Sequence, residues 1–445
     1  MSTRCTGLSR SGHSLRPYQE RAAAALLRND RFLLLLDMGM GKTATTLTAL
    51  LPGHLPAIVV STKRIVESTW PEELAEWRPD LSFRVASGTP AKRRAAIEDT
   101  SADILLISQD NLHTLSAKDH ARFRTVIFDE ISLFKSPGSR KTKAAHRVVK
   151  GKATVWGLTG TPAAERLSDI WSPVKLVDGG ERLETSQTKF FQKYYIPEYC
   201  PFKKVKWETL KPGAEDAIFA AVDDISLTML SRDYLDLPEL VFNDVRVRLP
   251  KHAREAYDEM RDTMLLGEEV TAANAGAKAS KLLQISAGFA YKEDGTAIDI
   301  HTAKMDALAE LVEQAQSPVL VFYTFRREAS MIAERFGAPT ELGKGVKEQW
   351  DEGKLPLLAL HVKSGAHGLN LQRGGHTIVW TTPPYSSELE QQANKRLHRP
   401  GQKHTVVVHT LRADVPIDSY VASKRGVKEE RHERLLAYLR GVSYG

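Results

Sequence analysis

The stretch 31-RFLLLLDMGMGKTATTLTAL-50 decides how the first part of this chain folds. The four leucines at 33–36 predict a buried strand, and the residues after Gly41 continue with the spacing of a helix. Gly39 and Gly41 allow the connecting turn to point backbone N–H groups inward, and the start of the helix adds a partial positive charge. The stretch therefore predicts a phosphate-binding loop. The alternative is a glycine-rich turn with a surface lysine.

One position departs from the strict phosphate-loop pattern G-x-x-x-x-G-K-[ST], because Leu36 stands where that pattern has its first glycine. Leu36 extends the buried strand instead, and the two later glycines suffice for the turn. In such a loop Lys42 is expected to reach the β and γ phosphates of the bound nucleotide, and the Thr43 hydroxyl is expected to bind Mg²⁺.

A second strand end supplies the carboxylates that hydrolysis requires. The stretch 126-VIFDEIS-132 places Asp129 and Glu130 directly after an apolar run. We expect Asp129 to bind Mg²⁺ and Glu130 to orient and deprotonate the attacking water. An Asp-Glu pair after a strand is common, so the pair alone does not indicate a catalytic site. Together with the preceding phosphate loop, in this order along the chain, it does.

Short apolar runs separated by long connections predict a parallel sheet covered on both faces. In the first part of the chain they occupy residues 31–38, 56–62, 102–108, 124–130 and 153–160. The pattern returns at 317–325, 356–362, 376–384 and 404–411. The fold class is therefore α/β, with two parallel-sheet lobes in tandem, a helical bridge and a terminal helix. The expected boundaries are 1–240 for the nucleotide-binding lobe, 241–300 for a helical linker, 301–422 for the second lobe and 423–445 for the last helix.

The composition is that of an ordinary globular protein. The 445 residues include 62 Lys and Arg against 55 Asp and Glu, for a net charge of +7, which weakly favours a polyanionic partner. Cys5 and Cys200 are too few for a disulfide framework, and no Cys/His cluster has zinc spacing. No secretion signal and no apolar run of about 20 residues is present, so a reducing cytoplasm is expected and a membrane partner is not.

In order along residues 15–411, these motifs resemble those of the superfamily-two helicases and translocases, and among them the Swi/Snf-type ATPases. The resemblance rests on 15-LRPYQ-19, DMGMGKT, DEISLFKS, 157-GLTGTP-162, 319-VLVFYTF-325, 364-SGAHGLNLQRGGHTIVW-380 and 391-QQANKRLHRPGQ-402. The last string is the most discriminating. This chain departs from the family at Ile131 and Ser132, where Ala-His or similar is usual, so no histidine role is expected there. The chain resembles compact forms found in bacteria and their viruses.

The resemblance implies two RecA-like lobes that bind ATP between them and a set of contacts to that nucleotide. It implies that Gln19 reads adenine. The implied nucleotide contacts are Arg16, Gln19, Met38, Gly39, Met40, Gly41, Lys42, Thr43, Ala44 and Gly368.

The sixth motif carries the charges expected to stabilise the transition state. Charge builds on the equatorial oxygens of the transferred phosphate, and arginines aimed at them lower the barrier. Arg396 and Arg399 lie three residues apart, so they are expected to share one face of a helix. Gln392 is expected one turn earlier, near water or phosphate. Surface arginines on an ordinary helix are the alternative.

Four residues at strand ends are expected to contact a nucleic-acid backbone. Thr62 and Lys63 end a strand at the edge where α/β sheets bind ligands, and Thr324 and Ser364 hold the corresponding places in the second lobe. The basic stretch 134–152 is either a phosphate-binding surface or a solvated helix face. The aromatic stretch 186–199 and the pair Trp70 and Trp77 are expected to be core.

These features predict an ATP hydrolase that moves along duplex DNA, with ATP and Mg²⁺ as cofactors. RNA stays open as a substrate. The alternatives are a strand-separating DNA or RNA helicase and a nucleotide-gated DNA-binding module with little turnover. A P-loop kinase or GTPase does not account for the second lobe. A monomer is expected, while protein partners, direction of movement and pathway are left open by the sequence.

Overall fold

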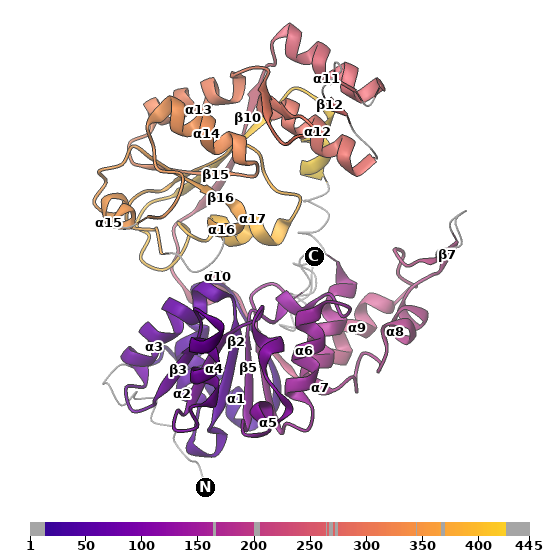
Figure 1. The fold of residues 1–445 in the computed structure, drawn as a ribbon, viewed down its shortest axis with the longest axis vertical. Coiled ribbons are helices and arrows are strands. Elements are labelled where there is room, and N and C mark those ends of the chain that lie inside the picture. The colour runs from indigo at the N-terminus through magenta and orange to yellow at the C-terminus, as the bar shows by residue number, and fades with distance from the viewer. Residues whose placement is uncertain are drawn as a thin grey trace. The chain divides into compact units, whose positions relative to one another are not determined.

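The computed structural model describes residues 14–162, 166–199, 205–263, 265–266, 270–271, 275–343, 345–365 and 370–423. Contacts within the chain divide these residues into two compact units (Figure 1), the first reaching Tyr234 and the second beginning at Leu235. Each unit is built on a parallel sheet flanked by helices. The last helix predicted from the sequence, residues 423–445, lies outside the described residues except for its first residue.

The first unit contains a seven-stranded sheet in which every neighbouring pair is parallel. In spatial order its strands are β3 (Phe83–Ala86), β4 (Ile104–Ser108), β2 (Ala57–Ser61), β5 (Thr125–Asp129), β6 (Thr154–Leu158), β1 (Arg31–Leu36) and β9 (Ser226–Met229). Every residue of β2, β4, β5 and β6 is buried, as continuous apolar runs between two helical layers require. The five strands that the sequence predicted here are confirmed.

Two strands of this sheet were missed from the sequence, and both lie at its edges. In β3 only one of the four residues is fully buried, and β9 is a short, partly polar SLTM. Neither has the continuous apolar run that marks the central strands, so the pattern could not identify them.

The helices of the first unit cover the sheet and extend it on one side. They are α1 (Pro17–Arg28), α2 (Lys42–Ala49), α3 (Trp70–Trp77), α4 (Pro90–Glu98), α5 (Ala117–Ala121), α6 (Arg140–Val149), α7 (Trp171–Asp178), α8 (Gln187–Tyr194), α9 (Ala214–Asp223) and α10 (Ser231–Tyr234). A small hairpin, β7 (Glu198–Tyr199) with β8 (Val205–Lys206), lies beyond α8 in Figure 1. The aromatic stretch is core as expected, because Phe190, Tyr194 and Tyr195 are all buried.

The second unit contains a five-stranded parallel sheet. Its order is β10 (Leu240–Val247), β18 (Val406–Ala413), β17 (Thr377–Trp380), β15 (Val319–Tyr323) and β16 (Leu357–His361). The last four confirm the strands predicted from the second set of apolar runs. Trp350, Phe322 and Trp380 are fully buried in its core.

The segment 241–300, expected as a separate helical linker, belongs to the second unit. Its first part is β10, which pairs with β18 over eight residues and forms the edge of the sheet. The helices α11 (Lys251–Thr263) and α12 (Ala275–Ala287) follow, with short hairpins β11 (Leu265–Leu266)–β12 (Val270–Thr271) and β13 (Phe289–Tyr291)–β14 (Ala297–Asp299). The two helices pack with the end of β18 through a shared apolar cluster.

The remaining helices of this unit are α13 (Ala303–Gln314), α14 (Arg326–Phe336), α15 (Val346–Asp351), α16 (Val362–Gly365) and α17 (Ser387–Asn394). Across the ranges that the structure describes, helices are too short or too polar to cross a lipid bilayer.

Candidate active site

The predicted phosphate loop lies between β1 and α2 in the first unit. Gly39 and Gly41 adopt the left-handed backbone conformation, with φ of 78° and 74°. A Cβ atom at Gly41 would come within 2.2 Å of the Gln19 Nε2 atom. Gly41 is therefore required both for its backbone conformation and for the close approach of α1.

The Lys42 ammonium group lies inside this loop. Its Nζ donates hydrogen bonds to the backbone oxygens of Leu36 at 2.9 Å and Asp37 at 3.3 Å. The cation thus occupies the concave side of the loop, beside carbonyl oxygens that an incoming phosphate could replace. Asp37 fixes the loop from the other side, because its carboxylate accepts from Met38 N at 2.9 Å and Ser231 Oγ at 2.7 Å.

Gln19, expected to read adenine, connects α1 to the phosphate loop. Its Oε1 accepts from Arg16 N at 2.8 Å, and its Nε2 donates to Met40 O at 3.1 Å. The Tyr18 hydroxyl donates to the same carbonyl at 3.2 Å. The structure therefore brings together Arg16, Gln19 and Met40, three of the expected nucleotide contacts.

Asp129 ends β5 and is 7% exposed. Its Oδ2 accepts a hydrogen bond from the Trp70 indole nitrogen at 2.9 Å. Burial raises the pKa of Asp129, while the Trp70 hydrogen bond and the nearby Lys42 charge act in the opposite direction. A buried carboxylate in this position favours a cationic ligand, because a cation would offset the cost of burying its charge.

Glu130 is held in an unusual backbone conformation. Its φ of 70° is left-handed, which is uncommon for a residue with a side chain and is often associated with functional sites. The Glu130 N–H donates to Leu158 O at 2.9 Å. Its Oε1 accepts from Ser132 Oγ at 2.8 Å and from Thr159 Oγ1. Thr159 in turn accepts from Thr161 N at 3.1 Å. The GLTGTP segment therefore fixes one oxygen of this carboxylate.

The strand order explains how residues so distant in sequence come together. In the sheet, β6 lies between β5 and β1, so the ends of all three strands are neighbours. At Gly160, just after β6, an added Cβ would lie 3.2 Å from Leu36 O at the end of β1. One sheet edge therefore carries the loop with Lys42 and Thr43, the two carboxylates and the Thr159 hydroxyl. Hydroxyl and carboxylate oxygens are the ligands that Mg²⁺ prefers, so this set fits a magnesium nucleotide.

At the end of β2, the candidate nucleic-acid contacts are partly buried. The hydroxyl oxygens of Ser61 and Thr62 are both buried and have no hydrogen-bond partner within the described residues. The Lys63 side chain is 71% exposed, with Glu67 at 3.9 Å as a weak partner. Two unpartnered buried hydroxyls beside an exposed lysine are consistent with a site that gains contacts from a ligand.

In the second unit, Thr324 is fixed by internal contacts. Its N–H donates to Glu328 Oε2 at 3.1 Å, and its hydroxyl donates to Thr382 O at 2.6 Å. Both hydrogen-bond donors of Thr324 are thus used within the unit, so in this arrangement neither is available to a phosphate oxygen. Glu328 is fully buried, burial raises its pKa, and it also accepts from Thr381 Oγ1 at 2.6 Å. Ser364 lies in α16, and Gly368 lies outside the described residues.

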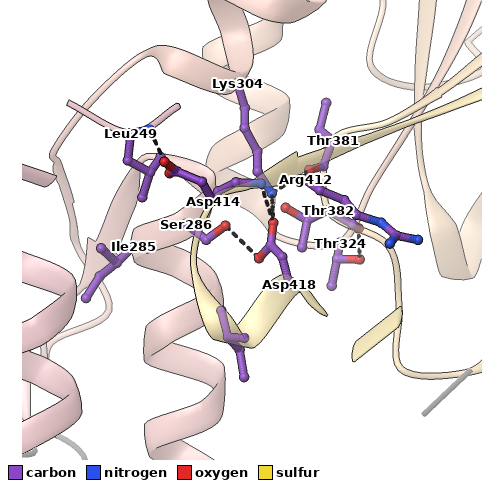
Figure 2. A network of polar contacts seen from close by, with 12 residues as sticks. Leu249, Ile285, Ser286, Lys304, Thr324, Thr381, Thr382, Arg412, Asp414 and Asp418 are labelled. Atoms are coloured by element: carbon purple, nitrogen blue, oxygen red, sulfur yellow. Dashed lines mark hydrogen bonds and ion pairs between the residues drawn. The ribbon is translucent and has the colours of Figure 1, made fainter. Parts of the chain in front are cut away.

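A buried ion pair adjoins these threonines (Figure 2). Lys304 Nζ lies 2.8 Å from Asp418 Oδ2, and their side chains are 1% and 6% exposed. Lys304 also donates to Thr381 O at 3.2 Å. Asp418 accepts two further hydrogen bonds, from Ser286 Oγ at 2.7 Å and Ala413 N at 2.8 Å. The pair therefore joins α12, α13 and the ends of β17 and β18.

The expectation that Arg396 and Arg399 share a helix face is wrong. The helix α17 ends at Asn394, and both arginines lie in the turn that follows. Pro400 disfavours helical backbone at the residue before it, and Asn394 accepts the Trp380 indole hydrogen bond at 3.0 Å where the helix stops. Arg396 is 8% exposed, and its Nε donates to Gln392 O at 3.0 Å.

Gln392 lies within α17 and is buried. Its Nε2 donates to Glu388 Oε1 at 3.4 Å, while its Oε1 has no partner within the described residues. The structure thus brings Gln392 and Arg396 into contact through the Arg396 bond to Gln392 O. The buried Gln392 Oε1 is an acceptor that a ligand could satisfy.

Sequence reasoning missed three residues that touch the carboxylates. Trp70 was expected only as core, and it is fully buried, but its indole also contacts Asp129. Thr159 and Ser132 hold Glu130. The Thr159 motif was noted, whereas no sequence signal pairs Trp70 with a carboxylate 59 residues away.

A parallel sheet with a phosphate loop, its lysine and two carboxylates at a neighbouring strand end defines a P-loop nucleoside triphosphatase. Comparison with known families identifies the group more closely, because the SNF2-related domain matches residues 18–293, which is more than half of the chain. The chain belongs to this family and is a Swi/Snf-type ATPase of helicase superfamily two.

Relatives extend over nearly the whole chain. The protein p41 of Acyrthosiphon pisum secondary endosymbiont phage 1 is 32% identical over 450 residues, which cover 95% of this chain and 97% of p41. An uncharacterized ATP-dependent helicase of Mycoplasma pneumoniae is 26% identical over 94% of this chain, but this chain spans only 42% of that helicase. The Sulfolobus solfataricus SWI2/SNF2 ATPase core in complex with dsDNA is similar with a TM-score of 0.47 and 20% identity, over 98% of this chain and 99% of that one.

Proposed function

We propose that this protein hydrolyses ATP in response to DNA and uses the energy to move along the duplex. The observation that carries the proposal is the convergence of Lys42, Asp129 and Glu130 on one sheet edge, in a chain of the SNF2-related family. ATP is the proposed substrate and Mg²⁺ the proposed metal. The fold alone would not distinguish a motor from a switch, so the argument depends on these residues.

Each residue at the edge has a proposed task. Lys42 exchanges its bonds to loop carbonyls for bonds to phosphate oxygens, and Thr43 and Asp129 hold the metal. When bound, Mg²⁺ neutralises phosphate charge and favours attack on the γ phosphate. The Trp70 indole keeps the Asp129 carboxylate in a fixed orientation.

Glu130 is proposed to accept the proton of the attacking water. Within the described part of the chain both hydrogen bonds to the Glu130 carboxylate end on Oε1, which leaves Oε2 for water. The left-handed backbone of Glu130 and its N–H bond to Leu158 set the direction of the side chain. A base whose own rotamer is fixed loses little orientational freedom in the reaction.

The second unit is proposed to supply positive charge to the transferred phosphate. Arg396 and Arg399 are the proposed donors, and Gln392 is proposed to contact water or phosphate through its unpartnered oxygen. In a turn, rather than on a helix, these arginines depend on neighbouring contacts for their direction, such as the Arg396 bond to Gln392 O.

Duplex DNA as the partner is supported by one face of α6. Arg140, Lys143, Arg147 and Lys150 are exposed at helical spacing in and just after α6, and the helix contains no acid. No ion pair to these four is found within the described residues. Other basic side chains of the first unit are paired, for example Arg94 with Asp119 at 2.7 Å. Unpaired cations in a row favour a polyanion.

The test is ATP turnover without nucleic acid and with single-stranded DNA, duplex DNA or RNA. The proposal expects the largest stimulation with duplex DNA. Turnover that is indifferent to every nucleic acid would contradict it. Release of a labelled strand from a forked duplex would instead favour a strand-separating helicase.

A further inference from the structure

A short, continuous piece of chain connects the candidate nucleic-acid contact to the candidate metal ligand. The strand β2 ends at Ser61, and the segment 61–64 continues through Thr62 into a helical start at Lys63. It passes directly into a π-helical turn, Ile65–Thr69, and then into α3, which begins at Trp70. Single π-helical turns are rare and frequently occur at functional sites.

The helix α3 is attached at its start to the candidate active site and at its end to the helix that follows the phosphate loop. At its start, the Trp70 indole donates to Asp129 Oδ2 at 2.9 Å. At its end, Arg78 Nη1 donates to Leu47 O at 3.0 Å and Leu50 O at 2.7 Å. These are carbonyls at the end of α2, the helix that begins with Lys42. The helix α3 therefore contacts both the metal-binding carboxylate and the phosphate-loop helix.

The Trp70 hydrogen bond differs from the other buried indole bonds of the chain. Trp156, Trp171 and Trp350 donate to the backbone oxygens of Asn29, Glu184 and Leu371, and Trp380 donates to the neutral side-chain amide oxygen of Asn394. A backbone oxygen is enough to satisfy a buried indole N–H. Trp70 instead donates to a charged group in the candidate active site, and such charge-assisted bonds are stronger and more directional.

We propose that Trp70 is a positioning residue that transmits contact with a nucleic-acid phosphate at residues 61–64 to the Asp129 carboxylate. The inference rests on the proposed function, because it assumes that these residues meet DNA and that Asp129 holds the metal. A phosphate drawn to the exposed Lys63 shifts the start of the π-helical turn. That shift moves the Trp70 ring at the start of α3 and, through the indole hydrogen bond, rotates the Asp129 carboxylate.

The test compares Trp70→Phe with Trp156→Phe. Both substitutions remove one buried indole N–H and keep an aromatic ring, and both tryptophans are 0% exposed. For each protein the Kd for duplex DNA is measured with and without Mg²⁺ and a non-hydrolysable ATP analogue. The ratio of the two Kd values is the coupling factor, which is the same when nucleotide affinity is measured with and without DNA.

In the native protein, we expect a coupling factor clearly different from one. Trp70→Phe is expected to reduce that factor by about tenfold, the equivalent of about 1.4 kcal/mol. Trp156→Phe is expected to leave it unchanged. The variant Arg78→Gln, which releases the other end of α3 without touching Asp129, is expected to reduce the factor in part, and it replaces Trp70→Phe if that variant does not fold.

Several outcomes overturn the inference. These are a native coupling factor of one, an unchanged factor in both Trp70→Phe and Arg78→Gln, and an equal loss in Trp156→Phe. The proposed function has a separate readout. If duplex DNA stimulates native turnover and the factor does not respond to Trp70, only this inference fails. If duplex DNA neither binds nor stimulates, the proposed function itself fails.

Discussion

The buried pair of Lys304 and Asp418 yields a stability prediction that can be worked from its contacts. The perturbation is Asp418→Asn, which keeps the volume of the side chain and removes its charge. Lys304 would then lie 1% exposed with one remaining described acceptor, Thr381 O at 3.2 Å. Ser286 Oγ and Ala413 N donate to different carboxylate oxygens of Asp418, and an amide has only one acceptor oxygen. The change therefore removes the acceptor of one of these donors as well as the charge that compensates the ammonium.

Removing one partner of a buried ion pair costs about 3–5 kcal/mol, because the other charge stays buried. For a unit of this size, 1 kcal/mol corresponds to about 2–4 °C in Tm. We therefore expect the Tm of the second unit to fall by roughly 6–20 °C. Lys304→Met is expected to cost less, because Asp418 retains the donors Ser286 Oγ and Ala413 N.

The control is Asp414→Asn, four residues earlier and shown beside the pair in Figure 2. Asp414 pairs with Arg254, but these side chains are 37% and 44% exposed. Exposed pairs contribute about 0–1 kcal/mol, so this variant is expected to lower Tm by at most about 4 °C.

The assay is thermal unfolding followed by tryptophan fluorescence. Trp350 and Trp380 are the tryptophans of the second unit, and both are fully buried. Replacing the tryptophans of the first unit by phenylalanine separates the two signals. The reasoning would be refuted if Asp418→Asn lowered the Tm by less than about 3 °C. It would also be refuted if Lys304→Met lowered the Tm more than Asp418→Asn does.

Four further predictions concern the candidate site and the charges around it. Glu130→Gln is expected to lower ATP turnover by about 10²–10⁴-fold while ATP binding is kept, because it removes the base alone; lost binding in a nucleotide titration would contradict this role. Arg399→Ala is expected to lower kcat much more than ATP affinity, and equal losses would make it a binding residue only. Arg147→Gln is expected to reduce the slope of log Kd for duplex DNA against log salt by about 0.9, whereas Arg28→Gln, of equal charge change, leaves it unchanged; equal slopes for both variants would count against α6. Burial lowers the pKa of His301, so the unfolded state binds more protons below its usual pKa of 6.5, and the free energy of unfolding falls as pH drops below that value. Denaturant unfolding at pH 7 and pH 5 should show a smaller loss in His301→Gln than in the native protein.

The central fold could be predicted from sequence because its strands are buried on both faces. Five strands of the first sheet and four of the second are continuous apolar runs, and the phosphate loop and the Asp129–Glu130 pair are local patterns. The edge strands β3 and β9 lack such runs. Local sequence patterns therefore identified the central strands and the phosphate loop, but not the edge strands.

The rest depends on contacts between distant residues or on how an element ends. The spacing of Arg396 and Arg399 predicted one helix face, but α17 stops at Asn394, before either arginine. The Trp70 bond to Asp129 depends on how α3 packs against the sheet. The internal bonds of Thr324 depend on β17 and α14, which no spacing in the sequence reveals.

The order of the first sheet also has a consequence for how the protein is made. The strand β1 pairs only with β6 and β9 in the described sheet, with Arg31 opposite Val155 and Leu33 opposite Ser226. At a synthesis rate of about 5–20 residues per second, roughly 6–25 s pass between the synthesis of β1 and the synthesis of β6, its first partner strand. The nascent chain exposes an apolar segment throughout this time. We expect the early chain to be a substrate for chaperones at the ribosome, and the phosphate loop to form only after GLTGTP has emerged.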